Sequence, residues 1–152
     1  MVELAPVRSR IEESMEDRYL FRGKRIDTGE WIIGSLLVDK QQDIETGEQI
    51  EIIGIYPSEY KDFAKKIDPS TICQCTGLRD KNDALIWEKD ILMAYLDEDH
   101  PEDVTYAKIE WNGSGWITHE NNNEDQEYFD DFVLENYEVV GNIFDNPRLL
   151  EV

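Results

Sequence analysis

The sequence predicts a mainly β, β-rich α+β fold: a small bent sheet with one helix, and short strands that favour a strongly bent barrel or sandwich. Strand-like runs recur at regular spacing, turn residues separate them, and one segment has a clear helical period. With 152 residues, of which 40% are hydrophobic and 11% aromatic, the chain can bury a core. One domain, or two small lobes, is therefore expected.

The first half of the chain is expected to hold three strands and the helix. Residues 1–18 form an extension, flexible or helical, because apolar residues recur there at helical spacing. Strands are predicted at residues 19–21, 31–38 and 50–56, and Gly34 marks a bulge or a close approach of two backbones. The helix is predicted near residues 58–67, with one apolar face made of Tyr60, Phe63, Ala64 and Ile67.

The second half is expected to be strands and turns. Strands are predicted at residues 70–76, 85–96, 104–111, 115–120 and 137–144. The hairpin around residues 112–115 is the clearest, because apolar residues alternate with Lys108 and Glu110 before the Asn112-Gly113 turn. Residues 119–131 are expected to form a solvated loop whose end Phe129 and Phe132 hold to the core.

The charge of the chain restricts its partners. The net charge is −20, and residues 90–152 alone carry 17 acidic residues against Lys108 and Arg148, a balance of −15. Direct binding of nucleic acid is disfavoured, since phosphate backbones are bound by clusters of Lys and Arg. The acidic surface serves solubility, meets a basic protein partner, or imitates nucleic acid.

Two features indicate a reduced, cytoplasmic protein. No apolar run has the length of a membrane span, and the first residues lack the hydrophobic segment of a signal peptide, so neither a membrane nor an export role is expected. Cys73 and Cys75 stand two residues apart with no further Cys or His ligand nearby, which favours buried thiols over a zinc or copper site. No cofactor or metal is expected.

Three carboxylates invite a catalytic interpretation. Asp80, Glu88 and Asp90 could form an acid/base or metal-binding set, but a tight turn before the strand at Ile91 also explains them, since Asp accepts unpaired backbone N–H groups in turns. The acidic loop of residues 97–103 lacks the order of an EF-hand, and His100 and His119 stand in no catalytic motif. The turn is the favoured interpretation, and no catalytic residue is assigned.

The residues left for a partner are aromatic and acidic. Trp111 and Trp116 flank the hairpin turn and could line a groove for a peptide, or one could lie in the core with the other half exposed. The predicted partner-binding surface consists of Trp111, Trp116, Asp97, Asp99 and Asp103.

The segment TGLRDKNDALIWEKDIL, residues 76–92, resembles the TGL-x-DKNGK-x-IYEGDI signature of the YopX-like family of bacteriophage and prophage proteins. FRGKRIDTGEWIIGSLL, VTYAKIEWNGSGW and YEVVGNIFDNPRLL agree with the same family. The resemblance implies a domain over residues 19–150, with an N-terminal lobe (19–75) and an SH3-like barrel lobe (76–150). The family is uncharacterised, so the resemblance implies no catalytic residues.

The departures from the signature make a structural prediction. Asp83 and Lys89 stand where the signature has glycine, so turns that need a positive φ are expected to be built from costlier residues. Cys75 stands where an aromatic residue is usual, which supports a buried thiol.

Three functional hypotheses follow. The leading one is a non-enzymatic accessory protein that binds another protein or forms a homo-oligomer through exposed strand edges. The alternatives are an acidic DNA mimic that inhibits a nucleic-acid-binding protein, and a metal-dependent hydrolase that uses the clustered carboxylates.

Overall fold

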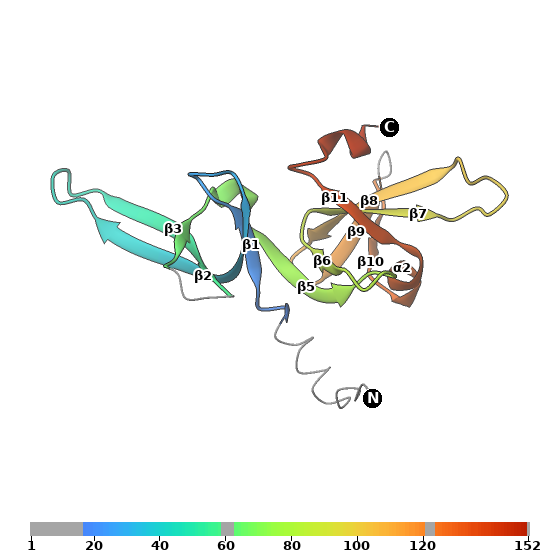
Figure 1. The fold of residues 1–152 in the computed structure, drawn as a ribbon, viewed down its shortest axis with the longest axis horizontal. Helices are drawn as coiled ribbons and strands as arrows, with labels where there is room; N and C mark the ends of the chain where they lie inside the picture. Colours follow the sequence, from blue (N-terminus) through green and yellow to red (C-terminus); the bar gives the residue numbers. More distant parts are fainter. Residues whose placement is uncertain (1–16, 59–62, 121–123, 152) are drawn as a thin grey trace, which may run out of the picture. The chain divides into compact units, whose positions relative to one another are not determined.

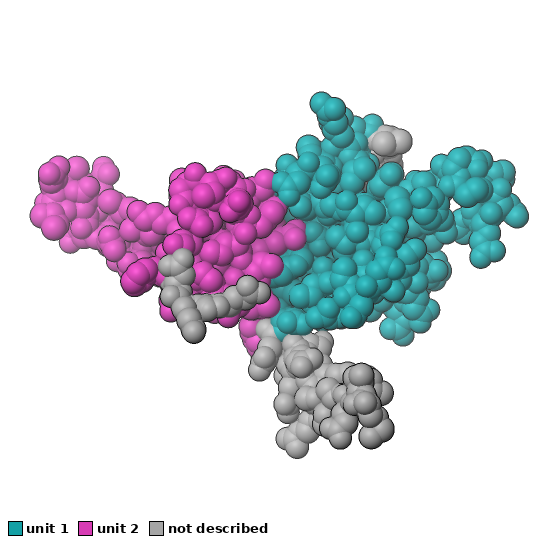
Figure 2. All heavy atoms as spheres, in the orientation of Figure 1, with its two compact units in different colours: residues 1–18, 75–152 teal, residues 19–74 magenta. Residues whose placement is uncertain are grey.

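The structure is a computed structural model that describes residues 17–58, 63–120 and 124–151. The chain divides into two compact units within strand β5 (Figure 2). Unit 2 comprises Tyr19–Gln74, and unit 1 comprises Met1–Arg18 and Cys75–Val152. No helix in the described part of the chain is long and apolar enough to cross a membrane.

Unit 2 is an antiparallel sheet with one long hairpin. Its strands lie in the order β4-β3-β2-β1-β5. They are β1 (Phe21–Lys24), β2 (Trp31–Gln42), β3 (Gln49–Pro57), β4 (Lys65–Lys66) and the start of β5 (Cys73–Arg79), with the 3-10 turn η1 (Pro69–Thr71) before β5. The β2–β3 pairing continues from Gly34–Pro57 to Gln42–Gln49, so this hairpin extends past the shorter strands β1 and β4 (Figure 1).

The predicted close approach at Gly34 is confirmed. A Cβ atom at this position would lie 1.8 Å from the carbonyl oxygen of Tyr56, so only glycine fits without a shift of the backbone. The small core of unit 2 lies nearby and includes Ile55 and Ile67, which are 0% and 1% exposed. The sheet therefore depends on a residue with no side chain at the base of its longest hairpin.

The helix predicted near residues 58–67 is wrong where the structure describes this segment, and residues 59–62 lie outside the described part. Lys65 and Lys66 form strand β4 and pair with Ile55 and Gly54 of β3. Ile67 forms a bridge with Arg25 and is buried. Pairing with the edge of β3 and burial of Ile67 stabilise a strand here more than the apolar spacing stabilises a helix, because such spacing is a weak local preference.

Unit 1 contains the remainder of β5, paired with β6 (Leu85–Trp87), and a five-stranded antiparallel sheet in the order β10-β9-β8-β7-β11. The sheet consists of β7 (Asp90–Tyr95), β8 (Val104–Trp111), β9 (Trp116–Glu120), β10 (Gln126–Tyr128) and β11 (Glu138–Asn142). Helix α2 (Asp131–Asn136) precedes β11, and the 3-10 turn η2 (Pro147–Leu150) follows it. The mainly β fold class is confirmed. The predicted SH3-like barrel is not confirmed, because no closed barrel is found among the described residues.

The core of unit 1 follows the alternation that the sequence predicts for β8. Ala107 and Ile109 are buried there, and they pack with Ile86, Leu92, Ala94, Val133 and Tyr137. Phe129 packs against this cluster as predicted, whereas Phe132 is 54% exposed and does not anchor the loop. Phe132 lies in α2, a helix that the sequence did not predict and that Asp130 caps by accepting the Val133 N–H at 3.1 Å.

Candidate functional site

The charged trio Glu88-Lys89-Asp90 forms the predicted tight turn. The Asp90 side chain is 1% exposed, and its Oδ2 accepts the backbone N–H of Trp87 at 2.7 Å. Lys89 has a φ of +67°. In this conformation its N–H donates to the carbonyl of Ile109 at 2.7 Å, and its carbonyl accepts from Ile143 N–H at 3.0 Å. The turn thus joins the end of β8 to the segment after β11.

Asp80 has a similar structural role. Its Oδ1 accepts the N–H groups of Asn82 at 2.8 Å and Ala84 at 2.9 Å, which closes the turn between β5 and β6. Its Oδ2 accepts the N–H of Val139 in β11 at 2.7 Å. The Asp80 side chain is 7% exposed and accepts three backbone N–H groups. It therefore links two parts of the chain that are distant in sequence.

The predicted positive φ values at the two turns are confirmed, because Asp83 and Lys89 are the non-glycine residues with positive φ in the described part of the chain. We expect Asp83→Gly to stabilise the protein by about 0.5–1 kcal/mol, since glycine adopts this conformation without strain while the unfolded chain gains some entropy. Urea unfolding measures the change. Lys81→Gly is the matched control, because Lys81 lies in the same turn at negative φ, and it should destabilise the protein by about 0.5–1 kcal/mol. If both substitutions changed the stability in the same direction and by the same amount, the backbone of Asp83 would not be strained.

Asp80, Glu88 and Asp90 do not form a metal-binding group with one another in the described part of the chain. The group that does bring three ligand types together is His100, Glu102 and Asp103, with ligand atoms within 4.8 Å of one another, in the loop between β7 and β8. All three side chains are exposed, and His100 Nδ1 lies 3.2 Å from Glu102 Oε1. Exposed acidic groups of this kind are common in proteins without an ion, so we assign no function to it.

Cys73 and Cys75 are both buried and do not form a disulfide, as the sequence predicts for core thiols. The Cys73 thiol donates to the carbonyl of Thr71 at 3.3 Å. Burial, and to a lesser extent the negative charge of Asp17, raises the pKa of the Cys75 thiol. Both residues therefore behave as small apolar side chains and not as thiolate ligands.

Tyr137 makes the stability of unit 1 depend on pH. Burial and the carboxylates of Glu120 and Glu127 raise the pKa of Tyr137 to about 12, and its hydroxyl donates to Glu120. The folded protein thus holds this proton over a range where the unfolded chain loses it. We expect this contribution to be complete below about pH 10 and to fall by up to about 2 kcal/mol as pH rises to about 12.

The measurement is urea unfolding at several alkaline pH values for the wild type and for Tyr137→Phe, which removes the titrating hydroxyl. As pH rises from about 10 to about 12, the unfolding free energy of the wild type should fall relative to that of Tyr137→Phe. A constant difference would show that Tyr137 does not titrate with a raised pKa.

The structure places the predicted partner-binding residues at two ends of one strand. Trp111 ends β8 and pairs with Trp116 across the hairpin turn, with ring centroids 5.1 Å apart and ring planes at 66°. Trp111 is 52% exposed, while Trp116 packs against the core. Asp97, Asp99 and Asp103 precede the same strand, so they lie roughly 25 Å or more along the sheet from Trp111.

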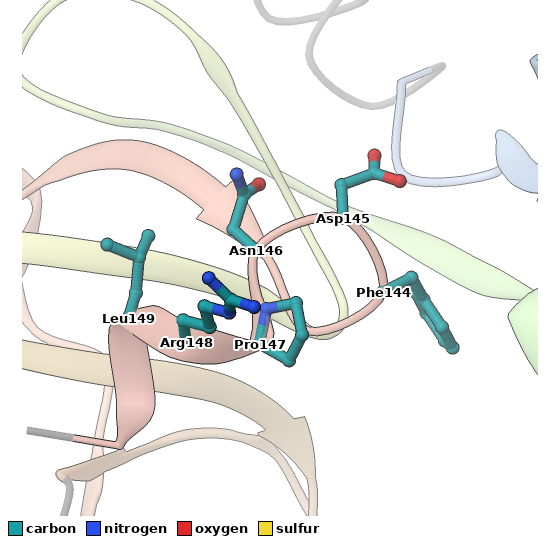
Figure 3. Close-up of a pocket in the computed structure, with 6 residues that line it drawn as sticks. All are labelled: Phe144, Asp145, Asn146, Pro147, Arg148 and Leu149. Carbon is teal, nitrogen blue, oxygen red and sulfur yellow. The ribbon is translucent and has the colours of Figure 1, made fainter.

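Among the described residues of unit 1, two surface hollows stand out. One of about 250 Å³ is lined by Ile109, Trp111, Ile143 and charged residues of the 88–90 turn and of β8. The other, of about 450 Å³, is lined by the consecutive residues Phe144 to Leu149 (Figure 3). Asn146 and Asp145 in the second hollow accept hydrogen bonds from Asn142, so they hold their own loop in shape.

Comparison with known families decides where this chain belongs. The family model described as YopX protein matches residues 20–151, which include both units from β1 to η2. The chain belongs to the YopX family. No curated protein matches this YopX family member.

One solved structure similar to this YopX family member is the crystal structure of protein EF1440 from Enterococcus faecalis. The two chains are 23% identical, with a TM-score of 0.51, and the match covers 86% of this chain and 96% of the other. At this identity the likeness shows a shared fold and carries no function across.

The sequence interpretation of this YopX family member missed the length of β2. The strand was predicted to end at Val38, but the polar residues 39–42 continue β2 and pair with residues 49–52 of β3. β2 pairs with β1 only through Trp31 to Gly34. At residues 35–42, the backbone edge of β2 opposite β3 therefore has no strand partner in the described part of the chain. Isolated polar residues such as Lys40 gave no local signal of this edge.

Proposed function

We propose that this YopX family member is a non-catalytic protein-binding module that assembles with a second copy of itself through the edge of β2 at residues 35–42, here called the open edge. The observation that carries the proposal is that this strand edge has no partner strand among the described residues. Edge backbone N–H and C=O groups are a template for a further strand, and natural proteins usually shorten or cover such an edge. The phage or prophage setting implied by the sequence resemblance is part of the proposal.

The side chains around the open edge support an assembly role. Leu37 and Ile50 are 42% and 43% exposed, Val38 is 53% exposed, and Ile44 at the hairpin tip is 99% exposed. Because side chains alternate along a strand, Leu37 and Val38 lie on opposite faces of the ribbon. A two-stranded ribbon with apolar side chains on both faces is only marginally stable in water, so a partner that covers it is favoured.

A second copy presents the same edge, and a two-fold arrangement satisfies both edges at once. The charge of the hairpin opposes this pairing: residues 35–52 carry Asp39, Asp43, Glu45, Glu48 and Glu51 against Lys40. Salt screens such repulsion, so self-association should strengthen as salt rises. Capture of a basic partner by nucleic-acid mimicry has the opposite dependence, because salt weakens attraction between opposite charges.

Analytical ultracentrifugation at low and high NaCl tests the proposal. We expect a dimer whose dissociation constant falls with salt, and loss of the dimer in Leu37→Lys, which places a charge beside the open edge while lowering the net negative charge. The matched control is Ile33→Lys, which changes an equally exposed residue (41%) where β2 is already paired with Arg22 of β1. A wild-type chain that stays monomeric at about 100 μM in high salt, or a dimer that Leu37→Lys leaves intact, would reject it.

A further inference from the structure

The smaller hollow of unit 1 is lined by both apolar and charged residues. Its apolar lining residues are Trp111, Ile143 and the fully buried Ile109. Glu88 and Glu110 stand among its charged lining residues. Its volume of about 250 Å³ is smaller than a typical site for a whole small-molecule ligand and suits a single inserted side chain.

Trp111 is held in place before any ligand arrives. Its ring meets that of Trp116 edge to face, and Trp116 is anchored on the core. The turn after Trp111 is fixed by the Asn112 side chain, whose Oδ1 accepts the N–H groups of Ser114 and Gly115, both at 2.9 Å. The Tyr128 hydroxyl lies 3.1 Å from the side chains of Asn112 and Ser114 and braces the turn from β10. A rigid, half-exposed tryptophan loses little entropy on binding.

Charge determines which side chain fits. The two cations that line the hollow are already engaged, because Lys108 Nζ lies 2.8 Å from Glu110 Oε1 and Lys89 Nζ lies over the Phe144 ring at 5.4 Å. Residues 90–152 carry a net charge of −15, so the surrounding field attracts cations and repels anions. The face of an indole ring attracts cations as well, and arginine stacks on it through its planar guanidinium group.

This chain already contains such a contact elsewhere. In unit 2, the guanidinium carbon of Arg22 lies 4.6 Å from the ring centre of Trp31, and Lys24 Nζ lies 5.3 Å from the same centre. Among the described residues of unit 1, no arginine or lysine lies over the Trp111 ring, and half of the Trp111 surface is exposed. An incoming cation can therefore make at Trp111 the contact that Trp31 makes within the chain.

We propose that the hollow beside Trp111 binds an arginine side chain of a basic partner protein. The guanidinium group lies against the open face of Trp111 near the Glu88 carboxylate, and the aliphatic stem lies against Ile143. This site lies in unit 1 and is separate from the open edge in unit 2, so either proposal can fail while the other stands.

The test uses the full chain and the peptide acetyl-Ala-Leu-Arg-Leu-Ala-amide. The indole N–H signal of Trp111, assigned with the Trp111→Phe variant, is followed by NMR during titration. We expect a saturable shift, and at least about five-fold weaker binding of the peptide in which citrulline, a neutral group of the same shape, replaces arginine. Equal binding of the two peptides, or no shift up to about 10 mM peptide, would overturn the proposal.

Variants locate the site. Trp111→Ala should weaken the arginine peptide at least about five-fold, as judged from the Ile109 and Ile143 methyl signals, and Glu88→Gln should weaken it about two-fold or more. Tyr95→Ala is the matched control, because Tyr95 is also half exposed (51%) but ends β7 opposite Val104, at the far end of β8 from Trp111. If Tyr95→Ala weakened binding of the arginine peptide as much as Trp111→Ala does, the peptide would be binding exposed aromatic and acidic residues without preference. That result would refute a site at Trp111.

Discussion

Asp80→Ala is expected to destabilise unit 1 by about 3–4 kcal/mol. The substitution removes the acceptor for three backbone N–H groups, those of Asn82, Ala84 and Val139. Each buried donor that loses its acceptor costs about 1–3 kcal/mol, although water can reach Asn82 and Ala84 and reduces their share. The loss at Val139 is the most costly, because it separates β11 from the turn that follows β5.

Urea unfolding at neutral pH measures this effect. Asp80→Asn keeps one of the two side-chain oxygens as an acceptor, so it should cost less stability than Asp80→Ala. That oxygen can accept either from the turn N–H groups or from the Val139 N–H, and only the other bonds are lost. The control is Asp97→Ala, which removes a comparable turn bond, from Asp99 N–H at 2.9 Å, at an exposed position. It should change stability by less than about 0.5 kcal/mol.

The result also discriminates between the two interpretations of Asp80. A catalytic carboxylate is held at some cost to stability, so its removal commonly leaves a protein as stable or more stable. A gain in stability for Asp80→Ala would therefore reopen the hydrolase hypothesis. A loss of the expected size would identify Asp80 as part of the fold.

Local turn chemistry is the part of this fold that the sequence could predict. Asn112-Gly113 predicted the β8–β9 hairpin, and the bonds of the Asn112 side chain account for it. Asp83 and Lys89, which replace glycine in the signature, predicted the two positive φ values. In each case the cause lies within a few residues of its effect, so the pattern is visible in the sequence.

Features that depend on distant contacts could not be predicted in this way. Lys65 and Lys66 become a strand because β3 offers them an edge, and β10 forms in a polar tract because β9 lies beside it. Nothing local to these residues favours a strand. The open edge of β2 also depends on distant residues. It exists because β1, which pairs with one side of β2, is shorter than β3, which pairs with the other side.

The candidate site shows the same limit. The sequence identified Trp111 and Trp116 as a pair because they flank a recognisable turn, and it left open which of them is exposed. The hollow beside Trp111 depends on the turn at Lys89 and on Ile143 after β11, which meet through backbone bonds between distant segments. Only the fold brings these residues to one place.

Gly34→Ala is expected to disrupt unit 2, with a loss of about 3 kcal/mol or more. The new methyl group would lie 1.8 Å from the Tyr56 carbonyl oxygen and 2.7 Å from its carbonyl carbon, distances at which no side-chain rotation can help because both atoms belong to the backbone. The strands β2 and β3 must separate at the base of the hairpin, where Gly34 pairs with Pro57. The pairing that supports the open edge would then be lost, so the dimer proposed above should dissociate as well.

Hydrogen exchange measured by mass spectrometry can follow the two units separately. In Gly34→Ala, peptides from residues 31–57 should lose protection, whereas peptides from residues 104–120 should keep it, because each unit has its own set of internal contacts. Ser35→Ala, at the neighbouring exposed position of the same strand, is the control and should leave both regions unchanged. Equal loss of protection in both regions would mean that the units unfold as one cooperative body, and unchanged protection at residues 31–57 would mean that the backbone at Gly34 yields to a methyl group.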